Sequence, residues 1–273
     1  MKSTNHILDT ALEISDQAAE LIRLSSQKIK SFKSKGEVSN LVTQTDVEVD
    51  KLITKKIKES FPEHNIVSEE LGSNNLSSDY TWYIDPIDGT NNFVHNYPSF
   101  AVSIGVFFKS KPLVGVVYDI PNNEKFFASK GGGSFSNDSP ISVSDKDHFN
   151  EGLYVTGFIP YDKNYIDKNL QVIKNINLNS HGVRRLGAAS LDMCHVAKGI
   201  VEGFWEYNLQ PWDTAAGNII ISEAGGTVSN ENGNQYNFDK CIVASNKKVH
   251  KDFLKIIKAV SYTHLTLPTI LRV

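Results

Sequence analysis

The chain has 273 residues, of which 40% are hydrophobic and 22% are charged, and its formal net charge at pH 7 is -3. A chain of this length can bury one large core or two closely joined ones. The small negative charge and the lack of a long Lys/Arg block argue against an extended nucleic-acid interface, which usually needs a basic face. We therefore expect an ordinary globular protein for which nucleic acid is an unlikely partner.

The two cysteines and the N-terminus favour a cytoplasmic protein. Cys194 and Cys241 lie in no zinc-ligand spacing, so we expect two reduced, buried thiols. The N-terminus lacks the apolar run of a secretory signal, and no stretch approaches the length of a membrane span. We expect no membrane contact.

The first part of the chain predicts two helices. Apolar residues recur at three- and four-residue steps from 5 to about 32, which is typical of a long amphipathic helix. After a polar linker, Thr45 and Glu48 stand three apart, and we interpret them as a capping box that opens a second helix. This helix is expected to end before Pro62.

Residues 64–120 change to a two-residue alternation, which predicts strands joined by short turns in an antiparallel meander. The expected strands are 64–68, 82–84, 100–108 and 113–118.

The second half alternates predicted strands and helices. The expected strands are 152–158, 182–185, 201–206 and 241–244, and the expected helices are 164–176, 188–198, 212–224 and 247–258. Gly199 and Gly225 are interpreted as stop signals for the second and third of these helices. Residues 261–273 show neither helical spacing nor a strand pattern, and we interpret them as a non-native or disordered tail, with a mobile natural tail as the alternative.

The most informative stretch is W-Y-I-D-P-I-D-G-T-N-N-F, residues 82–93, where an apolar strand leads into two aspartates three apart. Pro86 fixes one backbone dihedral between Asp85 and Asp88, and Gly89 allows a sharp turn or a close approach to a ligand. The two carboxylates can then converge on one point. Magnesium takes such oxygen ligands, and a helix that starts after Gly89 would direct N–H groups at a phosphate.

A pair of aspartates with this spacing is, on its own, more often a turn former or a helix cap. Two further acids change this interpretation. Glu69 ends another expected strand, and Asp213 opens the expected helix 212–224. Each alone could be a surface acid or a partner of a helix dipole.

Three separate motifs carry a resemblance to a known family. They are S-E-E-L-G (68–72), D-P-I-D-G-T-N-N-F (85–93), and P-W-D-T-A-A-G (211–217) followed by E-A-G-G (223–226). In order and spacing they resemble the signatures of the inositol monophosphatase family of magnesium-dependent, lithium-sensitive phosphatases, from the first helix to about Ala259. The resemblance implies an α/β layered sandwich in which helices alternate with two β-sheets, and a homodimer.

The resemblance also implies where the parts of the site lie. Residues 1–150 would form a helix pair and an antiparallel sheet with most metal ligands, and residues 151–260 an α/β half with Asp213 and the substrate contacts. Two or three Mg²⁺ ions are expected. The first would be held by Glu69, Asp85 and the carbonyl of Ile87, the second by Asp85, Asp88 and Asp213, and a weaker third near Glu69.

The remaining roles follow from the same resemblance. Thr90 and Asp46 would position the attacking water beside the metal bound by Glu69, although Asp46 could simply be a first-turn helix acid. Residues with substrate contacts would be Asp88, Gly89, Thr90, Gly187, Ala189, Glu206 and Asp213, with Gly187, Ala189 and Glu206 on the polyol. Arg184 and Arg185 leave substrate preference open, because they could meet a second anionic group or lie in solvent or at an interface.

The expected function is hydrolysis of a small phosphorylated polyol, foremost myo-inositol monophosphate, by a metal-activated water. Neither cysteine nor any Ser-His-Asp spacing suggests a covalent nucleophile, and His95 and His195 are interpreted as surface or core residues. Alternative substrates are fructose 1,6-bisphosphate, nucleotide 3'-phosphates and histidinol phosphate. A different class of function is a macromolecular interaction role on the same fold.

Overall fold

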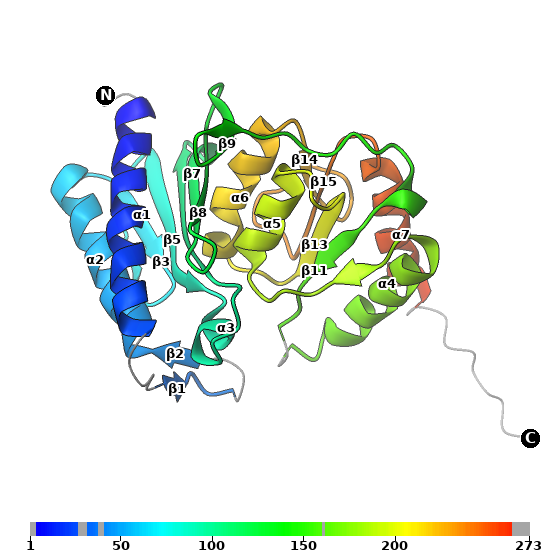
Figure 1. Cartoon of the computed structure of the whole chain (residues 1–273), viewed down its shortest axis with the longest axis horizontal. Coiled ribbons are helices and arrows are strands. Elements are labelled where there is room, and N and C mark those ends of the chain that lie inside the picture. Colours follow the sequence, from blue (N-terminus) through cyan, green and yellow to red (C-terminus); the bar gives the residue numbers. More distant parts are fainter. Residues whose placement is uncertain (1–3, 27–31, 38–40, 160–161, 264–273) are drawn as a thin grey trace, which may run out of the picture.

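Helices and two sheets alternate in layers in the computed structural model, which describes residues 4–26, 32–37, 41–159 and 162–263 (Figure 1). The outer helix pair, α1 (Thr4–Ser26) and α2 (Gln44–Ser60), covers an eight-stranded sheet. Helices α5 (Ala189–Ala197) and α6 (Pro211–Glu223) lie between this sheet and a five-stranded sheet, whose far side carries α4 (Ile166–Asn179) and α7 (His250–Thr263). The α/β layered sandwich predicted from the sequence is confirmed.

The eight-stranded sheet has the strand order β10-β9-β8-β7-β6-β5-β3-β4. Its strands are β3 (Asn65–Ser68), β4 (Gly72–Ser73), β5 (Tyr80–Asp88), β6 (Ala101–Phe108), β7 (Lys111–Asp119), β8 (Glu124–Ser129), β9 (Gly133–Ser136) and β10 (Ser139–Pro140). The expected antiparallel meander runs from β5 onward, but β3 lies parallel to β5, so the meander prediction was wrong at its start. The reason is that β3 turns back into the short edge strand β4, and the chain then returns to the other side of β3.

The entry to α2 also differs from the prediction. The capping box consists of Thr43 and Asp46, not of Thr45 and Glu48. Strand β1 (Phe32–Ser34) pairs antiparallel with β2 (Leu41–Thr43). Because β2 ends at Thr43, this residue is the N-cap and the helix begins at Gln44. The predicted first helix was therefore too long, since its last expected residue belongs to β1.

The five-stranded sheet has the order β12-β11-β13-β15-β14. Its strands are β11 (Tyr154–Thr156), β12 (Val183–Arg184), β13 (Gly203–Tyr207), β14 (Thr227–Asn230) and β15 (Cys241–Ser245). The predicted alternation of strands and helices is confirmed, although β14 was missed because its four residues T-V-S-N carry little apolar signal. A single 3₁₀ turn, Phe149–Glu151, precedes β11.

Helix α6 lies directly on the eight-stranded sheet because two strands present glycine to it. A Cβ built on Gly105 would lie 2.6 Å from the Cβ of Ala215, and one built on Gly115 would lie 2.6 Å from a methyl group of Ile219. Any side chain at these positions of β6 or β7 would push the helix away. The glycines therefore allow the middle of α6 to pack closely against the sheet.

Two further local predictions are confirmed by the structure. Gly199 and Gly225 follow α5 and α6 with φ of +72° and +88°, which confirms them as stop signals. Cys194 and Cys241 are free and buried, as expected. Among the residues that the structure describes, none of the helices is long and apolar enough to cross a membrane.

The C-terminal end of the described chain lies in α7. This helix runs to Thr263, three residues into the segment that we interpreted as a tail. Residues 264–273 lie outside the described residues, so the nature of that segment stays a prediction. The proposed division of the chain near residue 150 also stays a prediction.

Candidate active site

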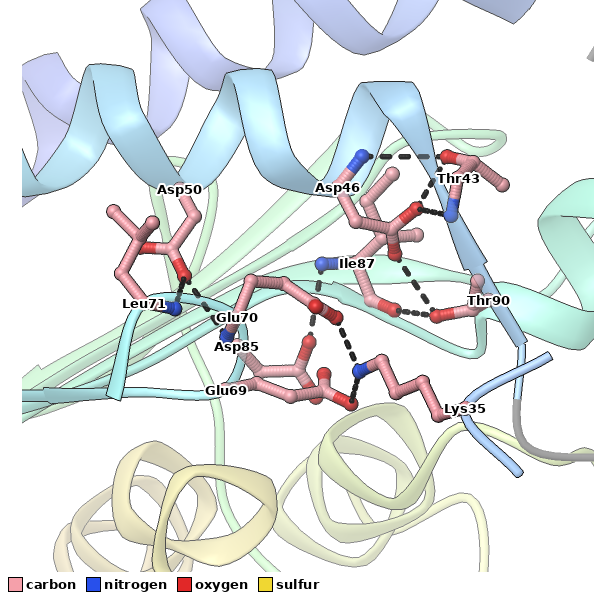
Figure 2. A network of polar contacts seen from close by, with 10 residues as sticks. All are labelled: Lys35, Thr43, Asp46, Asp50, Glu69, Glu70, Leu71, Asp85, Ile87 and Thr90. Atoms are coloured by element: carbon pink, nitrogen blue, oxygen red, sulfur yellow. Dashed lines mark hydrogen bonds and ion pairs between the residues drawn. The ribbon is translucent and has the colours of Figure 1, made fainter. Parts of the chain in front are cut away.

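A pocket of about 470 Å³ opens where the end of β5 meets the starts of α3 (Thr90–Val94), α5 and α6. Most of the site residues expected from the sequence line it: Glu69, Asp88, Gly89, Thr90, Gly187, Ala189, Glu206 and Asp213. Three expected site residues do not line the pocket but are buried next to it: Asp46, Asp85 and Ile87. Figure 2 shows them beside two residues of the lining, Thr90 and Glu69. The fold therefore brings together residues that are up to 167 positions apart in the chain, from Asp46 to Asp213.

The end of β5 presents Asp85 and Asp88 at an irregularity in the sheet. Pairing with β6 shifts register between these two residues, where Pro86 has no N–H to donate to the ladder. Asp85 accepts a hydrogen bond from the backbone N–H of Ile87 at 3.0 Å. Both aspartates are buried, with only 2% and 8% of their surface exposed. The irregular backbone lets them lie close enough for the charge of Asp88 to act on Asp85.

The first turn of α5 fixes Asp88. Its carboxylate accepts hydrogen bonds from the backbone N–H groups of Ala189 (3.3 Å) and Ser190 (2.7 Å) and from the Ser190 hydroxyl (2.5 Å). A carboxylate at a helix N-terminus is also favoured by the helix dipole. Sequence reasoning missed Ser190, since nothing in A-A-S-L marks the serine as a partner of a residue about a hundred positions earlier.

Asp213 lies in the first turn of α6, as expected. Its carboxylate accepts a hydrogen bond from the backbone N–H of Gln210 at 2.7 Å, and Pro211 occupies the first helical position, where its missing N–H costs nothing. The close packing of α6 on Gly105 and Gly115 supports the helix that carries this cap.

Glu69 is carried by the loop after β3, and a residue that the sequence analysis did not single out holds this loop. Asp50 of α2 accepts hydrogen bonds from the backbone N–H groups of Glu70 (3.0 Å) and Leu71 (3.1 Å) (Figure 2). The only available sequence signal was its position four residues after Asp46, on the same face of the helix. Lys35 contacts Glu69 at 3.1 Å and Glu70 at 2.5 Å.

Asp46 caps α2 and also contacts the hydroxyl of Thr90. One carboxylate oxygen accepts from the backbone N–H of Thr43 at 2.9 Å and from the Thr43 hydroxyl, which closes the capping box. The other oxygen lies 3.0 Å from the Thr90 hydroxyl, which is also 3.0 Å from the carbonyl of Ile87 (Figure 2). A first-turn helix acid thus orients a hydroxyl of the pocket.

Burial raises the pKa of all four acids, and at Asp85 and Asp213 the charges of the other acids add to the shift. Burial raises the pKa of Asp85 well above its ordinary value, and the charges of Glu69, Asp88 and Asp213 raise it further. The pKa of Asp213 is likewise raised by burial and then by Asp88 and Glu69. Burial raises the pKa of Asp88 to about 6, although its bonds to Ser190 and Ala189 oppose the shift. Without a cation, this acidic cluster of Glu69, Asp85, Asp88 and Asp213 opposes its own ionisation.

The donor set of the acidic cluster fits a hard divalent cation. All four side chains offer carboxylate oxygens, which magnesium prefers, and a cation would relieve the repulsion that raises their pKa values. Within the described ranges no three acidic, His or Cys side chains are already arranged about one point as metal ligands. Their oxygens bind backbone N–H groups or Lys35 instead, so a cation would have to compete with these bonds.

The other side of the pocket is formed by Gly187, Ala189 and Glu206. Glu206 of β13 is 6% exposed, and burial together with the charge of Asp88 raises its pKa to about 8, whereas Arg185 lowers it. Gly89 has φ +90°, and a Cβ there would lie 2.9 Å from the carbonyl oxygen of Ser99, so only glycine fits. His95 and His195 do not line this pocket.

Asn92 joins the two sides of the pocket, which the sequence analysis did not foresee. Its side-chain amide donates to the carbonyls of Ser99 (2.7 Å) and Leu186 (2.8 Å). These bonds tie α3 to the residue that precedes Gly187. The asparagine was visible in the D-P-I-D-G-T-N-N-F motif, but no spacing identified its partners.

A layered α/β fold with a buried acidic cluster beside a polar pocket defines a class of metal-dependent phosphate-ester hydrolases. The chain belongs to the inositol monophosphatase family, whose model matches residues 3–262. The family and the phosphatase class inferred from the three motifs are confirmed.

Among its relatives is "Phosphatase IMPL1, chloroplastic" of Arabidopsis thaliana, 40% identical over 263 residues, which cover 93% of this chain and 71% of that protein. "Putative Nus factor SuhB" of Neisseria meningitidis serogroup B is 38% identical over 258 residues, with 93% and 99% coverage.

Solved structures agree with the fold. The extragenic suppressor protein suhB from Bartonella henselae superimposes with a TM-score of 0.88 at 31% identity, over 93% of this chain and 98% of that chain. A structure described as IMPase/NADP phosphatase complexed with Mg²⁺ and phosphate has a TM-score of 0.82 at 25% identity, with 93% and 96% coverage.

Proposed function

We propose that the protein hydrolyses phosphate monoesters of small polyols, with myo-inositol monophosphate as the foremost substrate. The observation that carries the proposal is the acidic cluster, in which four carboxylates from three parts of the chain are packed beside a polar pocket and all have raised pKa values. A cluster with this electrostatic cost is useful mainly when cations bind it.

The proposed ligand sets keep the assignments made from the sequence. Glu69, Asp85 and the Ile87 carbonyl would hold one Mg²⁺, and Asp85, Asp88 and Asp213 a second, with a third near Glu69. Bound magnesium supplies a water of lowered pKa and charge stabilisation for the phosphoryl oxygens. Support comes from the metal-dependent family and from the solved relative described with Mg²⁺ and phosphate.

Thr90 and Asp46 would orient the attacking water. The Thr90 hydroxyl can donate to Asp46 at 3.0 Å, which leaves its lone pairs free to accept a hydrogen bond from a water in the pocket. Because Asp46 is fixed by Thr43, the hydroxyl is held in one direction before substrate binds. Such positioning converts a random encounter into an oriented attack on phosphorus.

The polyol would lie against Gly187, Ala189 and Glu206, with the phosphate at Asp88, Gly89, Thr90 and Asp213. Glu206 can accept a hydrogen bond from a ring hydroxyl when ionised and donate one when protonated. Both forms are accessible near neutral pH, since its pKa is raised to about 8.

The experiment that tests this function measures phosphate release from inositol 1-phosphate by the purified protein. We expect release with Mg²⁺, none after complete chelation, and recovery on adding Mg²⁺ back. A correctly folded Asp213→Asn variant should lose most of the activity. Undiminished release with EDTA, or from Asp213→Asn, would contradict the proposed roles.

A substrate panel completes this experiment. Fructose 1,6-bisphosphate, a nucleotide 3'-phosphate and histidinol phosphate, assayed beside inositol 1-phosphate, would rank the alternatives by kcat/KM. Lithium inhibition, which the family resemblance implies, belongs in the same assays.

A macromolecular interaction is a second candidate function. The specific observation is the 38% identical relative described as a putative Nus factor, which matches 93% of this chain. A pull-down whose partners persist with Asp88→Asn would support a role independent of catalysis. The proposed homodimer is tested by light scattering, and the proposed cytoplasmic location by fractionation of cells.

A further inference from the structure

A second pocket of about 280 Å³ lies along the second half of α6. Its walls come from the start of β7, the turn between β8 and β9, helix α6, and β14 with the segment that follows it (Figure 1). Among the described residues, the linings of this pocket and of the active site have no member in common. The volume is close to the lower end of the range for small-molecule sites, about 300–1,000 Å³, so the second pocket suits a small ligand.

Two ammonium groups line the second pocket without a partner in the protein. Lys111 and Lys130 are exposed, and neither forms an ion pair or donates a side-chain hydrogen bond to any described residue. The acid in the described lining, Glu223, accepts hydrogen bonds from the backbone N–H groups of Gly131 (2.9 Å) and Gly133 (3.1 Å) instead. The second pocket therefore offers two uncommitted positive charges.

A buried amide distinguishes this pocket from an ordinary surface with lysines. The side chain of Asn218 is 7% exposed and lines the pocket, yet its amide forms no hydrogen bond with any described residue. Only its backbone carbonyl is bound, by the hydroxyl of Ser222 at 2.7 Å. Buried polar side chains are nearly always hydrogen-bonded, because an unpaired group has lost its bonds to water. A polar group in the pocket would supply these bonds.

The rest of the wall is apolar and already in place. Pro112, Ile219 and Val228 line it, and Ile219 is only 3% exposed. Ile219 is held against Gly115 of β7, where a Cβ would lie 2.6 Å from its methyl group. The lining therefore fits a small organic anion, with its charged head at the lysines and a short apolar body against Ile219.

Tyr236 joins the second pocket to the start of α6. It lines the pocket, is 5% exposed, and its hydroxyl lies 3.4 Å from the hydroxyl of Thr214, the residue after Asp213. Burial raises the pKa of Tyr236, the contact with Thr214 opposes this shift, and the charge of Asp213 adds to it. A ligand packed on Tyr236 thus acts on the turn that carries Asp213.

We propose that the second pocket binds a small organic anion and that its occupancy slows the reaction through Tyr236, Thr214 and the first turn of α6. A shift of this turn moves Asp213, a proposed magnesium ligand. The binding part of the inference is independent of the proposed function, whereas the kinetic part rests on it.

The binding experiment uses phenylphosphonate and benzoate, which share an apolar ring and differ in the anionic head, with neutral benzamide as control. Titration calorimetry is done in EDTA, because the metal-free active site then carries uncompensated acids that repel anions. We expect one site per chain for at least one anion, and binding of benzamide at least about tenfold weaker. The tighter anion identifies the head group. Absence of binding by both anions would overturn the inference.

Two variants test the lining. Lys130→Gln and Asn218→Leu should each weaken binding of the anion about 5-fold to 20-fold, because a hydrogen bond is lost. The matched control is Lys251→Gln, which removes the same charge from an exposed position of α7 outside the pocket and should change binding less than about twofold. Equal weakening in Lys130→Gln and Lys251→Gln would overturn the site, since net charge alone would then explain the binding.

Phosphate release from saturating inositol 1-phosphate with Mg²⁺ measures the kinetic part. The anion should lower kcat about 5-fold, whereas competition at the active site would raise KM alone. Tyr236→Phe keeps the ring and removes the hydroxyl, so it should still bind the anion in EDTA but show no fall in kcat when the anion is added. A constant kcat in the unmodified protein, with binding detected, would overturn the link to Asp213. If no ester were hydrolysed at all, the proposed function would fail, and calorimetry would still decide the binding part.

Discussion

Two groups of buried carboxylates lie close together and differ in their surroundings. One group is surrounded by hydrogen-bond donors, and the other lies among further negative charges. On α2, Asp46 and Asp50 are surrounded by donors: backbone N–H groups of Thr43, Glu70 and Leu71, and hydroxyls. In the acidic cluster, Asp85 and Asp213 accept backbone hydrogen bonds from Ile87 and Gln210, while neighbouring charges raise their pKa. The first group shapes the site, and the second has the electrostatics of the proposed cation site.

The largest effect that would test this comparison is expected for Asp88→Asn. Loss of a proposed ligand of the second Mg²⁺ should reduce phosphate release at least about 1,000-fold, since a metal supplies several kcal/mol of transition-state stabilisation. An asparagine can still accept from Ser190 or Ala189, so the fold should persist. Asp119→Asn, which changes a buried acid of β7 outside the pocket, is the matched control. Kinetics and circular dichroism on both variants check this, and similar losses in both would contradict it.

A smaller loss is expected for Thr90→Val. The valine keeps the shape but removes the hydroxyl between Asp46 and the pocket, and loss of such positioning should reduce kcat about 100-fold with KM little changed. Thr90→Ser retains the hydroxyl and should keep most of the rate. If valine and serine variants behaved alike, the hydroxyl would have no part in orienting water.

Asp50→Ala tests the shaping role of the α2 pair. It leaves the backbone N–H groups of Glu70 and Leu71 without their partner, so the free energy of unfolding should fall by about 1–3 kcal/mol. Activity should fall too, because the loop carries Glu69. Urea unfolding measures the change, with the exposed Glu48→Ala on the same helix as control. A variant as stable as the control would show that the loop holds itself.

The smallest expected effect is a pH dependence of the metal-free protein. The pKa values of Asp88 and Glu206 are raised from 3.8 to about 6 and from 4.5 to about 8. The folded state therefore binds protons more tightly than the unfolded state, and the free energy of unfolding falls as pH rises from about 4 to about 8. Thermal unfolding in EDTA should show a lower Tm at pH 8 than at pH 5, and Mg²⁺ should raise Tm more at pH 8. A Tm that rises with pH in EDTA would contradict this account.

The acids of the site could be found from the sequence because their signals are local. Each acid lies in a short motif, such as an apolar strand that ends in D-P-I-D-G or an aspartate just after a helix-starting proline. One motif alone also fits a turn or a helix cap, and the order and spacing of the three motifs together pointed to the site. The partners that hold them could not be found. Ser190, Asn92 and Asp50 act through bonds to residues 7 to 102 positions away, and only the assembled layers define those pairs.

The misread capping box has the same origin. Both T-x-x-E and T-x-x-D fit the local rule near residue 45, and the choice between them is made by the pairing of β2 with β1. Likewise β3 alternates as an antiparallel strand would, but its parallel pairing with β5 depends on the edge strand β4. Local patterns identify elements, and contacts between elements decide their partners and ends.

The seating of α6 on Gly105 and Gly115 has a consequence for the order of assembly. Asp213 joins Asp85 and Asp88 only after residues from late in the chain have docked on a sheet made from early ones, so a partly synthesised chain lacks the complete cluster. The proposed cation site is therefore complete only when α6 has docked on the sheet. Under this proposal, magnesium binding would report that the two parts of the chain have come together.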